Sequence, residues 1–420
     1  MRARRFTLLL AACAALVVSV VPGALSAHAD AARTPIVLFP AFHFTKLLVT
    51  VHDQSVDPAC PRSGSFEDWF PNPEPSATFS QVCRDELLTL RYVDDAGTPM
   101  PQRFSNQRGV DVQILDYGKT ESAPFYEPMY EALERAGYTR DVNVRVAGYD
   151  ARLTPDIGDF LARTEKLIED TYRENGNTPV HLVGHSNGPI YAEYLLTHTS
   201  QAWKDKYIHG FTPIAGNFPG QGSLYPILFT GLNVQDFTFP TTLDNARSSA
   251  RMYLSAPSSY ISAADPRIFH DRETVVEDES TGQTYTPQDY GRLFSDAHLP
   301  WAKQIADHYI GFLHMSEPSS FPNGDVYAEK GSGISTVVGL GLHDLSVGQI
   351  VDASTPLFTR DGDVNQEDIT NEAVAAWAAM PCFHFSLTDN PGVDHFSLPS
   401  NPDVLARVIA DAARPRSHCS

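Results

Sequence analysis

Positive charge is scarce in this sequence of 420 residues: 31 lysines and arginines stand against 51 aspartates and glutamates, a formal net charge of −20. So acidic a chain would be repelled by a phosphate backbone, which argues against nucleic acid as a partner. Binding to anionic bilayers through charge alone is disfavoured in the same way, because it depends on basic clusters. If this protein engages a membrane, apolar surface must make the contact.

Long apolar runs are also scarce. The run Phe6–Val21 follows three arginines and precedes Ala27-His28-Ala29. A basic segment, a short apolar run and a small-residue site predict a signal peptide over residues 1–29 and hence a secreted, extracellular protein. This run is short for a membrane span, and no later stretch reaches about 18 apolar residues. The alternative is a lipoprotein signal at Leu10-Ala11-Ala12-Cys13, which would leave a very apolar segment at the new N-terminus.

Cysteine is rare, with five residues in the whole chain. Loss of Cys13 with the signal peptide would leave Cys60, Cys83, Cys382 and Cys419. An even number in an exported protein predicts disulfides, although four cysteines allow three pairings. No two of them have the spacing of metal ligands, so metal binding is a poor alternative.

The pentapeptide Gly184-His185-Ser186-Asn187-Gly188 is the most informative stretch. A buried-strand pattern, Pro179–Val183, precedes it and a helical pattern, Pro189–Leu196, follows it. The pentapeptide alone also occurs in ordinary turns, but G-x-S-x-G between a strand and a helix is typical of a nucleophile elbow. Its glycines allow a strained turn in which two backbones pass closely. The pattern predicts Ser186 as a nucleophile at a helix N-terminus, where partial positive charge favours an oxyanion.

Two partners are expected after such a serine, in the order acid and then histidine. An acidic turn that contains Asp361 and Asp363 lies downstream of the strand pattern Ser335–Leu340, and His395 lies in a loop after the pattern Cys382–Leu387. Strand ends are where an open α/β sheet places its chemistry. We expect His395 as the base and Asp363 as the acid that accepts its Nδ1–H. Asp361 is the alternative, although a neighbour two residues away can instead face solvent or cap the turn.

The remaining chain alternates between strand and helix patterns. Strands are expected at Ile36–Phe39, Val142–Gly148, Val180–Val183, Phe211–Ala215, Ser335–Leu340 and Phe383–Leu387. Helices are expected at Pro124–Ala136, Ile157–Arg173, Pro189–Thr197, Asp368–Ala378 and Pro402–Ala412. The alternation predicts an α/β fold with a mostly parallel sheet covered on both faces. Residues 43–110 and 221–325 interrupt it, and irregular segments of this length are usually functional lids or caps.

At this level of detail the sequence resembles the lecithin:cholesterol acyltransferase family, which includes lysosomal phospholipase A and the phospholipid:diacylglycerol and phospholipid:sterol acyltransferases. The resemblance runs from Pro35 to about Phe396. It rests on Pro35–Pro40, on Cys60 and Cys83 around Phe66–Trp69, on Tyr117–Thr120, Tyr149–Leu153 and Gln201–Phe211, and on the acidic turn and the Val393–His395 loop. The run Gln201–Ile208 is the most specific of these matches.

The resemblance implies an α/β-hydrolase fold over residues 30–420, with a membrane-binding lid at about 43–110 and a cap at about 221–325. Together with closeness in sequence it favours a disulfide between Cys60 and Cys83, which leaves Cys382 with Cys419. In the lid, Trp69 is the expected membrane contact.

Other apolar residues of this region are further candidates for membrane contact: Phe66, Phe70 and the segment Phe42–Val49. For all of these the alternative is core packing. The catalytic set implied is Ser186, Asp363 and His395, with the backbone N–H groups of Phe42 and Asn187 as the oxyanion hole.

Four segments depart from the family pattern. Asp363 is followed by Val364-Asn365 rather than by a Gly-Thr-Val type run. The Pro-Gly and small-residue turn after the first strand is replaced by the bulkier Pro40–Phe44, and Ala151 stands in place of a tryptophan. Ala215–Gly220, which contains Asn217, differs from the usual Gly-Ala-Pro-Trp-Gly-Gly. These changes preserve the chemistry class and leave the acyl acceptor open.

The function implied is that of a secreted serine acyltransferase or phospholipase A. It would cleave a fatty acyl ester of a glycerophospholipid through an acyl-enzyme on Ser186, at a membrane or lipid-particle surface. The acyl group would pass to water or to an alcohol such as a sterol, with no need for a metal ion or organic cofactor. The alternatives are a carboxylesterase or lipase that acts on neutral esters and a non-catalytic exported lipid-binding protein.

Overall fold

The computed structural model describes residues 33–70, 72, 76–231, 242–312, 325–350, 354–375, 377 and 384–416. Residues Arg33–Ser420 form one unit by backbone proximity. The predicted signal peptide and the predicted pairing of Cys382 with Cys419 lie outside the described residues.

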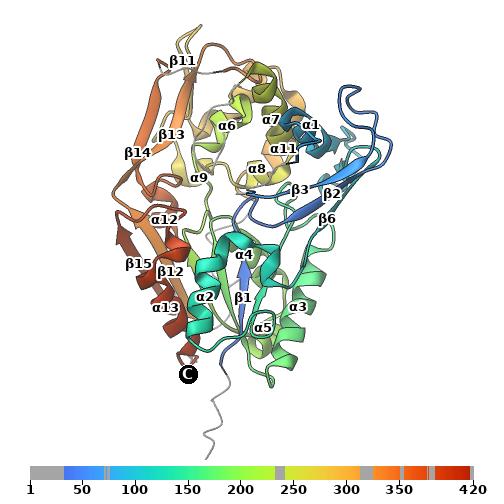
Figure 1. Ribbon diagram of the computed structural model, residues 1–420. Coiled ribbons are helices and arrows are strands. Elements are labelled where there is room, and N and C mark those ends of the chain that lie inside the picture. Colours follow the sequence, from blue (N-terminus) through green and yellow to red (C-terminus); the bar gives the residue numbers. More distant parts are fainter. Residues whose placement is uncertain are drawn as a thin grey trace, which may run out of the picture. The chain divides into compact units, whose positions relative to one another are not determined.

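A six-stranded sheet lies at the centre of this unit, and every pair of neighbouring strands in it is parallel (Figure 1). Its strand order is β15-β12-β9-β8-β1-β7. The strands are β1 (Ile36–Phe39), β7 (Val144–Val146), β8 (Val180–His185), β9 (Ile208–Ile214), β12 (Asp325–Ser332) and β15 (His384–Pro391). Parallel neighbours need crossover connections, which the helices between the strands provide.

Helices cover both faces of this sheet, as β1 shows. Successive strand side chains point to opposite faces. Val37 and Phe39 pack in one core cluster, with α3 (Phe160–Glu174) and α4 (Gly188–His198), and α5 (Gln201–Tyr207) adjoins α3. The alternate β1 residues pack in a second cluster, with α2 (Glu127–Arg135) and α13 (Pro402–Ala413). The predicted doubly covered parallel sheet is confirmed.

The segment after β1 folds as a small antiparallel sheet with strand order β3-β2-β6. Its strands are β2 (Leu47–Val51), β3 (Gly64–Asp68) and β6 (Val110–Ile114), and α1 (Gln81–Leu88) and the short pair β4 (Arg91–Tyr92) and β5 (Phe104–Ser105) lie between β3 and β6. A disulfide joins Cys60 to Cys83 with an S–S distance of 2.03 Å, so the predicted pairing is confirmed.

Residues 221–325, in which the sequence shows no clear period, contain a run of helices. They are α6 (Leu224–Thr230), α7 (Leu243–Ser255), α8 (Pro257–Ile261), α9 (Pro266–Phe269), α10 (Tyr290–Asp296) and α11 (Pro300–Tyr309). They lie at the end of the central sheet to which β1 points (Figure 1). All seven residues of α6 are buried, so that helix has no polar face that a helical period could reveal.

A second sheet of four strands, in the order β11-β10-β13-β14, adjoins these helices. Its strands are β10 (Val276–Asp278), β11 (Gln283–Tyr285), β13 (Ile334–Leu342) and β14 (Leu357–Gly362). The predicted strand Ser335–Leu340 is therefore real but belongs to this sheet, antiparallel to β14, and not to the central one.

The sequence did not predict the central strand β12, because two of its buried side chains are acidic. Asp325 accepts from His384 Nδ1 at 3.0 Å, and Glu329 accepts from Arg407 Nε at 2.6 Å. Buried carboxylates are tolerated when they are paired in this way. They nevertheless interrupt the apolar run by which a buried parallel strand is normally found.

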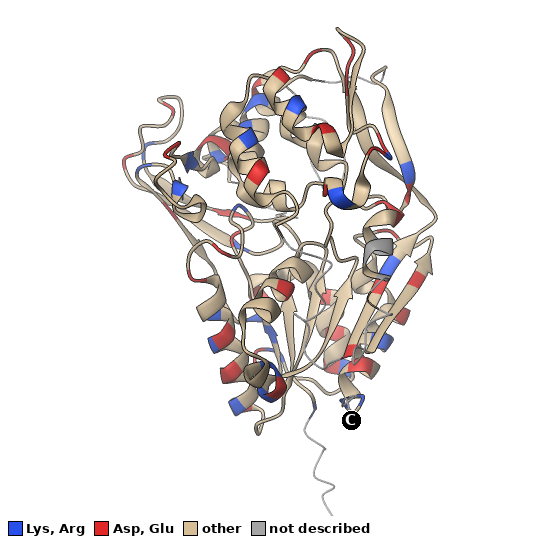
Figure 2. Ribbon diagram, turned by 180° about the vertical axis from the view of Figure 1, so that it is seen from behind, with Lys and Arg blue, Asp and Glu red and all other residues tan. Residues whose placement is uncertain are grey.

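Charged residues are interleaved along the outer helices, as Figure 2 shows. On α3, Lys166 Nζ lies 2.6 Å from Asp170 Oδ2, one turn further along. Such exposed pairs contribute little stability individually. In these local pairs a basic side chain lies next to an acidic one along the helix.

Candidate active site

Ser186 lies in the sharp turn between β8 and α4, with a φ of 60°. A serine rarely adopts this left-handed conformation, which costs free energy unless neighbouring bonds hold it. Two backbone bonds do so: Ser186 N–H donates to Ile214 O, and Asn217 N–H donates to Ser186 O, each at 2.9 Å. The end of β9 thus fixes the strained turn that presents the serine.

The two glycines of the pentapeptide permit close backbone approach. A Cβ at Gly184 would lie 2.8 Å from the nitrogen of Pro189, and one at Gly188 would collide with the carbonyl oxygen of Phe39. Neither contact could be relieved by a flexible side chain, because the opposing atoms are backbone. The sequence motif is therefore a packing requirement of the strand–turn–helix junction.

Asp363 and His395 are bonded to each other in the protein interior. Asp363 Oδ2 accepts from His395 Nδ1 at 3.0 Å, and these side chains are 0% and 1% exposed. The other carboxylate oxygen accepts from the backbone N–H groups of Asn365 and Gln366 at 3.1 and 2.7 Å. The His395 N–H also donates to the Asp363 carbonyl at 2.8 Å. Asp361 is exposed on β14, so the structure places Asp363, and not Asp361, against the histidine.

The strand directly before the acid is β14, which the sequence did not predict. Most of its residues are exposed or half-buried, so it carries no apolar signal. The acid nevertheless lies against the central sheet, because a Cβ built on Gly331 of β12 would lie 2.8 Å from Asp363 Cβ. His395 follows β15 in the loop from Gly392, where a strand end was expected.

A cavity of about 20 Å³ adjoins Ser186. Its lining includes both predicted oxyanion residues, Phe42 and Asn187, together with Asn217, Gln221, Leu224, Ser262 and Asn365. Asn365 Nδ2 lies 3.3 Å from His395 Nε2 and so connects this cavity to the histidine. The sequence did not predict the amide residues of the lining, although Asn217 stands in a segment that departs from the family pattern.

A buried hydrogen-bond chain connects the loop before Phe42 to the histidine loop. Ala41 N–H donates to Tyr126 Oη at 2.8 Å, and Tyr126 Oη lies 3.0 Å from His185 Nδ1. His185 Nε2 lies 3.0 Å from the His395 carbonyl, which can only accept. Nε2 therefore carries the proton, and Tyr126 donates to Nδ1.

The protonation states of this chain follow from its burial. Burial, followed by the charge of nearby His395, lowers the pKa of His185 well below its usual value, so this imidazole is neutral. Burial raises the pKa of Tyr126 well above 10, so its hydroxyl keeps the proton that it donates. The sequence did not predict either residue as part of the site.

The family model described as "Lecithin:cholesterol acyltransferase" matches residues 103–300. The chain is similar to the lecithin:cholesterol acyltransferase family in this region and to curated members of that family. The "Lysosomal phospholipase A and acyltransferase" of Mus musculus is 28% identical over 313 residues, which cover 71% of each chain. The "Phosphatidylcholine-sterol acyltransferase" of the same species is 31% identical over 244 residues, 56% of this chain and 53% of that protein.

Among solved structures, that of the Tle4–Tli4 complex contains a similar fold. The TM-score is 0.54 at 13% sequence identity, over 90% of this chain and 97% of that one. The parallel sheet covered by helices and the serine turn after β8 place the protein in the α/β-hydrolase fold. The predicted fold class and the predicted similarity to this family are confirmed.

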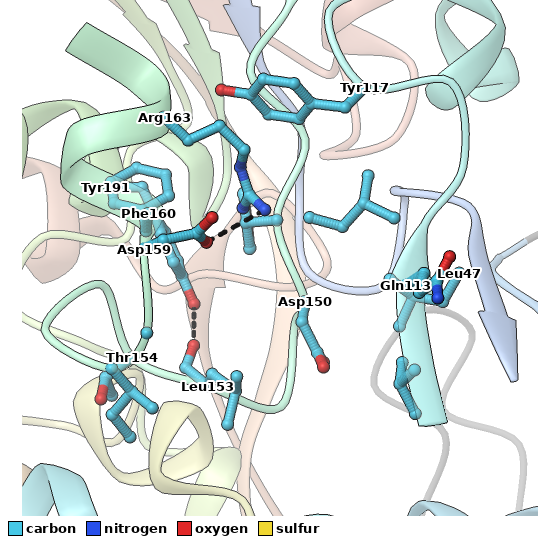
Figure 3. Close-up of a pocket in the computed structure, with 15 residues that line it drawn as sticks. Leu47, Gln113, Tyr117, Asp150, Leu153, Thr154, Asp159, Phe160, Arg163 and Tyr191 are labelled. Carbon is cyan, nitrogen blue, oxygen red and sulfur yellow. Dashed lines mark hydrogen bonds and ion pairs between the residues drawn. The ribbon is translucent and has the colours of Figure 1, made fainter. Parts of the chain in front are cut away.

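A larger cavity of about 360 Å³ lies between the small sheet β3-β2-β6 and the helices α3 and α4 (Figure 3). Figure 3 shows Leu47 of β2 and Gln113 of β6 on one side and Tyr191 of α4 on the other. Tyr149, which also lines it, stacks on Tyr191 and donates to the Pro40 carbonyl at 2.6 Å. This cavity therefore adjoins the loop that carries Phe42 but contains no member of the Asp363–His395 pair.

The aromatic candidates for membrane contact lie at different depths. Phe66 is 4% exposed and packs on Phe79, with ring centroids 5.0 Å apart, and the apolar residues of Phe42–Val49 are largely buried as well. Core packing is the correct interpretation for these residues. Trp69 and Phe70 are half-buried, and Phe70 stacks on a core phenylalanine. Trp69 is left as the candidate within this segment.

Proposed function

We propose that this protein is a serine acyl hydrolase and acyltransferase that cleaves a fatty acyl ester of a glycerophospholipid. The observation that carries the proposal is the buried bond between Asp363 and His395, on a fold that also holds Ser186 in a strained turn. The printed names of the relatives, which are phospholipase and phosphatidylcholine acyltransferase names, support a phospholipid as the acyl donor.

In the first half-reaction, His395 Nε2 takes the proton of Ser186 Oγ as that oxygen attacks the ester carbonyl carbon. Asp363 keeps the imidazole in the required tautomer and stabilises the imidazolium. The backbone N–H groups of Phe42 and Asn187 hold the oxyanion, and one such donor is typically worth about 3 kcal/mol of transition-state stabilisation. His395 then gives its proton to the leaving lysophospholipid oxygen, which leaves an acyl ester on Ser186.

In the second half-reaction, His395 takes a proton from an incoming hydroxyl whose oxygen attacks the acyl-enzyme. Collapse of the tetrahedral intermediate returns the proton to Ser186 Oγ. Water as the nucleophile gives a free fatty acid, and an alcohol gives a new ester. One set of residues thus supports both phospholipase and acyltransferase activity.

The same proposal places the protein outside the cell and at a lipid surface. The N-terminal pattern predicts export, and the Cys60–Cys83 disulfide suits an oxidising compartment. Residues 43–110 would form the lid that contacts lipid, through Trp69, and residues 221–325 the cap over the site. Within the described part of the chain, no helix has the length and apolar character of a membrane span.

Two measurements test the catalytic assignment. A fluorophosphonate probe should label Ser186 and fail to label Ser186→Ala or His395→Ala. Asp363→Asn should lower kcat by as much as about 10⁴-fold, because the wrong histidine tautomer is then favoured. Asp361→Asn is the matched control and should keep its activity. Full activity in Asp363→Asn would show that the acid is misassigned.

The acyl donor is tested by incubation with labelled phosphatidylcholine and, separately, with a neutral triacylglycerol. Release of fatty acid and lysophospholipid from the first substrate is the expected result. Efficient turnover of the neutral ester alone would favour a carboxylesterase or lipase. Absence of both turnover and probe labelling would favour a non-catalytic lipid-binding protein.

A further inference from the structure

The backbone carbonyl of Ser258 determines how two amide side chains beside Ser186, those of Asn187 and Asn217, are oriented. Ser262 Oγ–H donates to the Ser258 carbonyl at 2.9 Å, so its oxygen must accept the 2.7 Å bond from Asn187 Nδ2. Asn187 Oδ1 then accepts from Asn217 Nδ2 at 3.0 Å. The amide oxygen of Asn217 is the one side-chain oxygen of this series that accepts no hydrogen bond from a described residue.

Asn365 is oriented by a second set of acceptors. Its Nδ2 donates to Gln221 Oε1 at 3.3 Å and lies 3.3 Å from His395 Nε2. That nitrogen has no proton to give, because the proton of the imidazole is on Nδ1, toward Asp363. The amide nitrogen of Asn365 therefore faces two acceptors, and its oxygen points elsewhere.

Two buried acceptors are consequently left without a hydrogen-bond partner among the described residues, Asn217 Oδ1 and Asn365 Oδ1. Both residues are at least nine-tenths buried, with exposed fractions of 1% and 4%, and both line the cavity that Ser186 adjoins. Buried acceptors of this kind require a donor. The cavity of about 20 Å³ has room for about one water-sized group.

We propose that this cavity is the acyl-acceptor subsite and that it selects water or a small polyol, such as glycerol, over a sterol. The inference rests on the proposed acyl-enzyme at Ser186 and specifies which hydroxyl compound attacks it. Its basis is the number of protons that each acceptor can donate to the groups that line the cavity.

Two acceptors without a partner among the described residues, Asn217 Oδ1 and Asn365 Oδ1, belong to side chains of this cavity, and the base His395 Nε2 adjoins it through Asn365. Water brings two protons, one for the base and one for an amide oxygen, and glycerol brings three hydroxyl groups. A sterol brings one proton, which the base must take, and leaves both amide oxygens against hydrocarbon. Sites built to bond a polar group reject compounds that lack it. The cavity of about 20 Å³ holds one water-sized group, so any alcohol enters only when the surrounding side chains shift, and polarity rather than volume carries this selection.

The step balances without any further reactant. The acceptor oxygen forms a bond to the acyl carbon while His395 Nε2 takes its proton. The bond between that carbon and Ser186 Oγ then breaks, and the proton passes from His395 to Oγ. A second proton or hydroxyl of the acceptor donates to an amide oxygen and does not react.

The experiment uses p-nitrophenyl butyrate as a common acyl donor for the full chain. Glycerol, 1,2-propanediol and 1-propanol are compared at equal concentration. Release of p-nitrophenol reports formation of the acyl-enzyme, and chromatography of butyrate and its esters reports how it partitions. We expect several times more ester per hydroxyl group from glycerol than from 1-propanol. In phosphatidylcholine vesicles with cholesterol, sterol ester should stay below about one tenth of the free fatty acid.

Asn217→Ala and Asn365→Ala test the residues directly, because each removes one unpaired oxygen. Each should raise the yield of propyl ester relative to glyceryl ester, whatever happens to the total rate. A purely structural role would lower both products equally. Gln54→Ala is the control: Gln54 is a buried amide that bonds carbonyls of the disulfide loop, so this ratio should not change.

Equal ester yields per hydroxyl from glycerol and 1-propanol in the unmodified protein would overturn the inference, and so would sterol ester in amounts that match free fatty acid. Unchanged ratios in both asparagine variants would also overturn it. Absence of p-nitrophenol release together with absence of fluorophosphonate labelling would instead refute the proposed function itself.

Discussion

Replacement of Tyr126 by phenylalanine tests whether the oxyanion loop and the histidine loop are positioned by a shared hydrogen-bond chain. The Tyr126 hydroxyl accepts from Ala41 N–H at 2.8 Å and donates to His185 Nδ1 at 3.0 Å. Phenylalanine keeps the ring and removes only this hydroxyl. Ala41 immediately precedes Phe42, and His185 bonds the His395 backbone.

The expected loss of stability follows from the two partners that are left behind. A buried donor or acceptor without a partner costs about 1–3 kcal/mol, so Tyr126→Phe should lower the free energy of unfolding by about 2–6 kcal/mol. Native domains have roughly 5–15 kcal/mol in total, so the variant should still fold at moderate temperature. Urea denaturation monitored by circular dichroism measures this loss.

The catalytic effect should exceed what the stability loss explains. A displacement of catalytic groups by about 1 Å can cost of order 10²-fold in rate, and both loops lose a fixed point here. Hydrolysis of p-nitrophenyl butyrate is the suitable assay because a soluble ester makes no demand on membrane binding. We expect kcat to fall by about 10- to 100-fold with a smaller change in KM.

Tyr130→Phe is the matched control. Tyr130 lies on α2, which begins directly after Tyr126; it is equally buried and donates its hydroxyl to the Ala123 carbonyl at 3.0 Å. It should lose stability without losing kcat. If the two variants, both folded, showed the same kcat, the chain from Ala41 to His395 would have no positioning role.

Three further predictions concern pH, the disulfide and lipid contact. Burial raises the pKa of Glu193 from 4.5 to about 8. Between these values the folded state holds a proton that the unfolded state releases. The stability that this proton contributes is therefore fully present below pH 4.5 and is lost as the pH rises toward 8. Glu193→Gln should remove most of this decline, of order 3–5 kcal/mol, in urea midpoints compared at pH 5 and pH 8, and an equally steep decline in the variant would contradict the assignment. Replacement of Cys60 and Cys83 by serine opens a 23-residue separation and should cost about 3 kcal/mol of local order, weakening action on vesicles more than on a soluble ester; equal losses would mean that the loop supports the core. Trp69→Ala should lower activity on zwitterionic vesicles several-fold, through about 1–3 kcal/mol of lost apolar contact, with little change on the soluble ester or with salt; normal vesicle activity would place lipid contact elsewhere.

Sequence patterns predicted the parts of the fold whose signal is local. β1 has the predicted bounds, and α4 and α13 match to within one residue at each end, because apolar runs and proline-initiated helices follow from neighbouring residues alone. The serine turn was predictable for the same reason: its glycines are required by the close approach of adjacent elements.

Elements whose stability depends on distant partners were missed. β12 is central, yet Asp325 and Glu329 make sense inside a sheet only because His384 and Arg407 reach them from later in the chain. β14 is mostly exposed and is held by pairing with β13. Neither strand satisfies a rule that examines one segment at a time.

The acceptor subsite shows most clearly why such features need three dimensions. Its amides come from three separate parts of the chain, after β8, between β9 and α6, and after β14, and each is an ordinary polar residue in its own segment. The Ser258 carbonyl, in α8, determines the direction of the Asn187 and Asn217 bonds, and Gln221 and His395 determine that of Asn365. Only when the donors are followed from one residue to the next do Asn217 Oδ1 and Asn365 Oδ1 emerge as acceptors that no described residue bonds. The reaction class can therefore be inferred from a family motif. Acceptor selection instead depends on how many acceptors around the buried cavity need a proton, and this number changes when one of these amides is replaced.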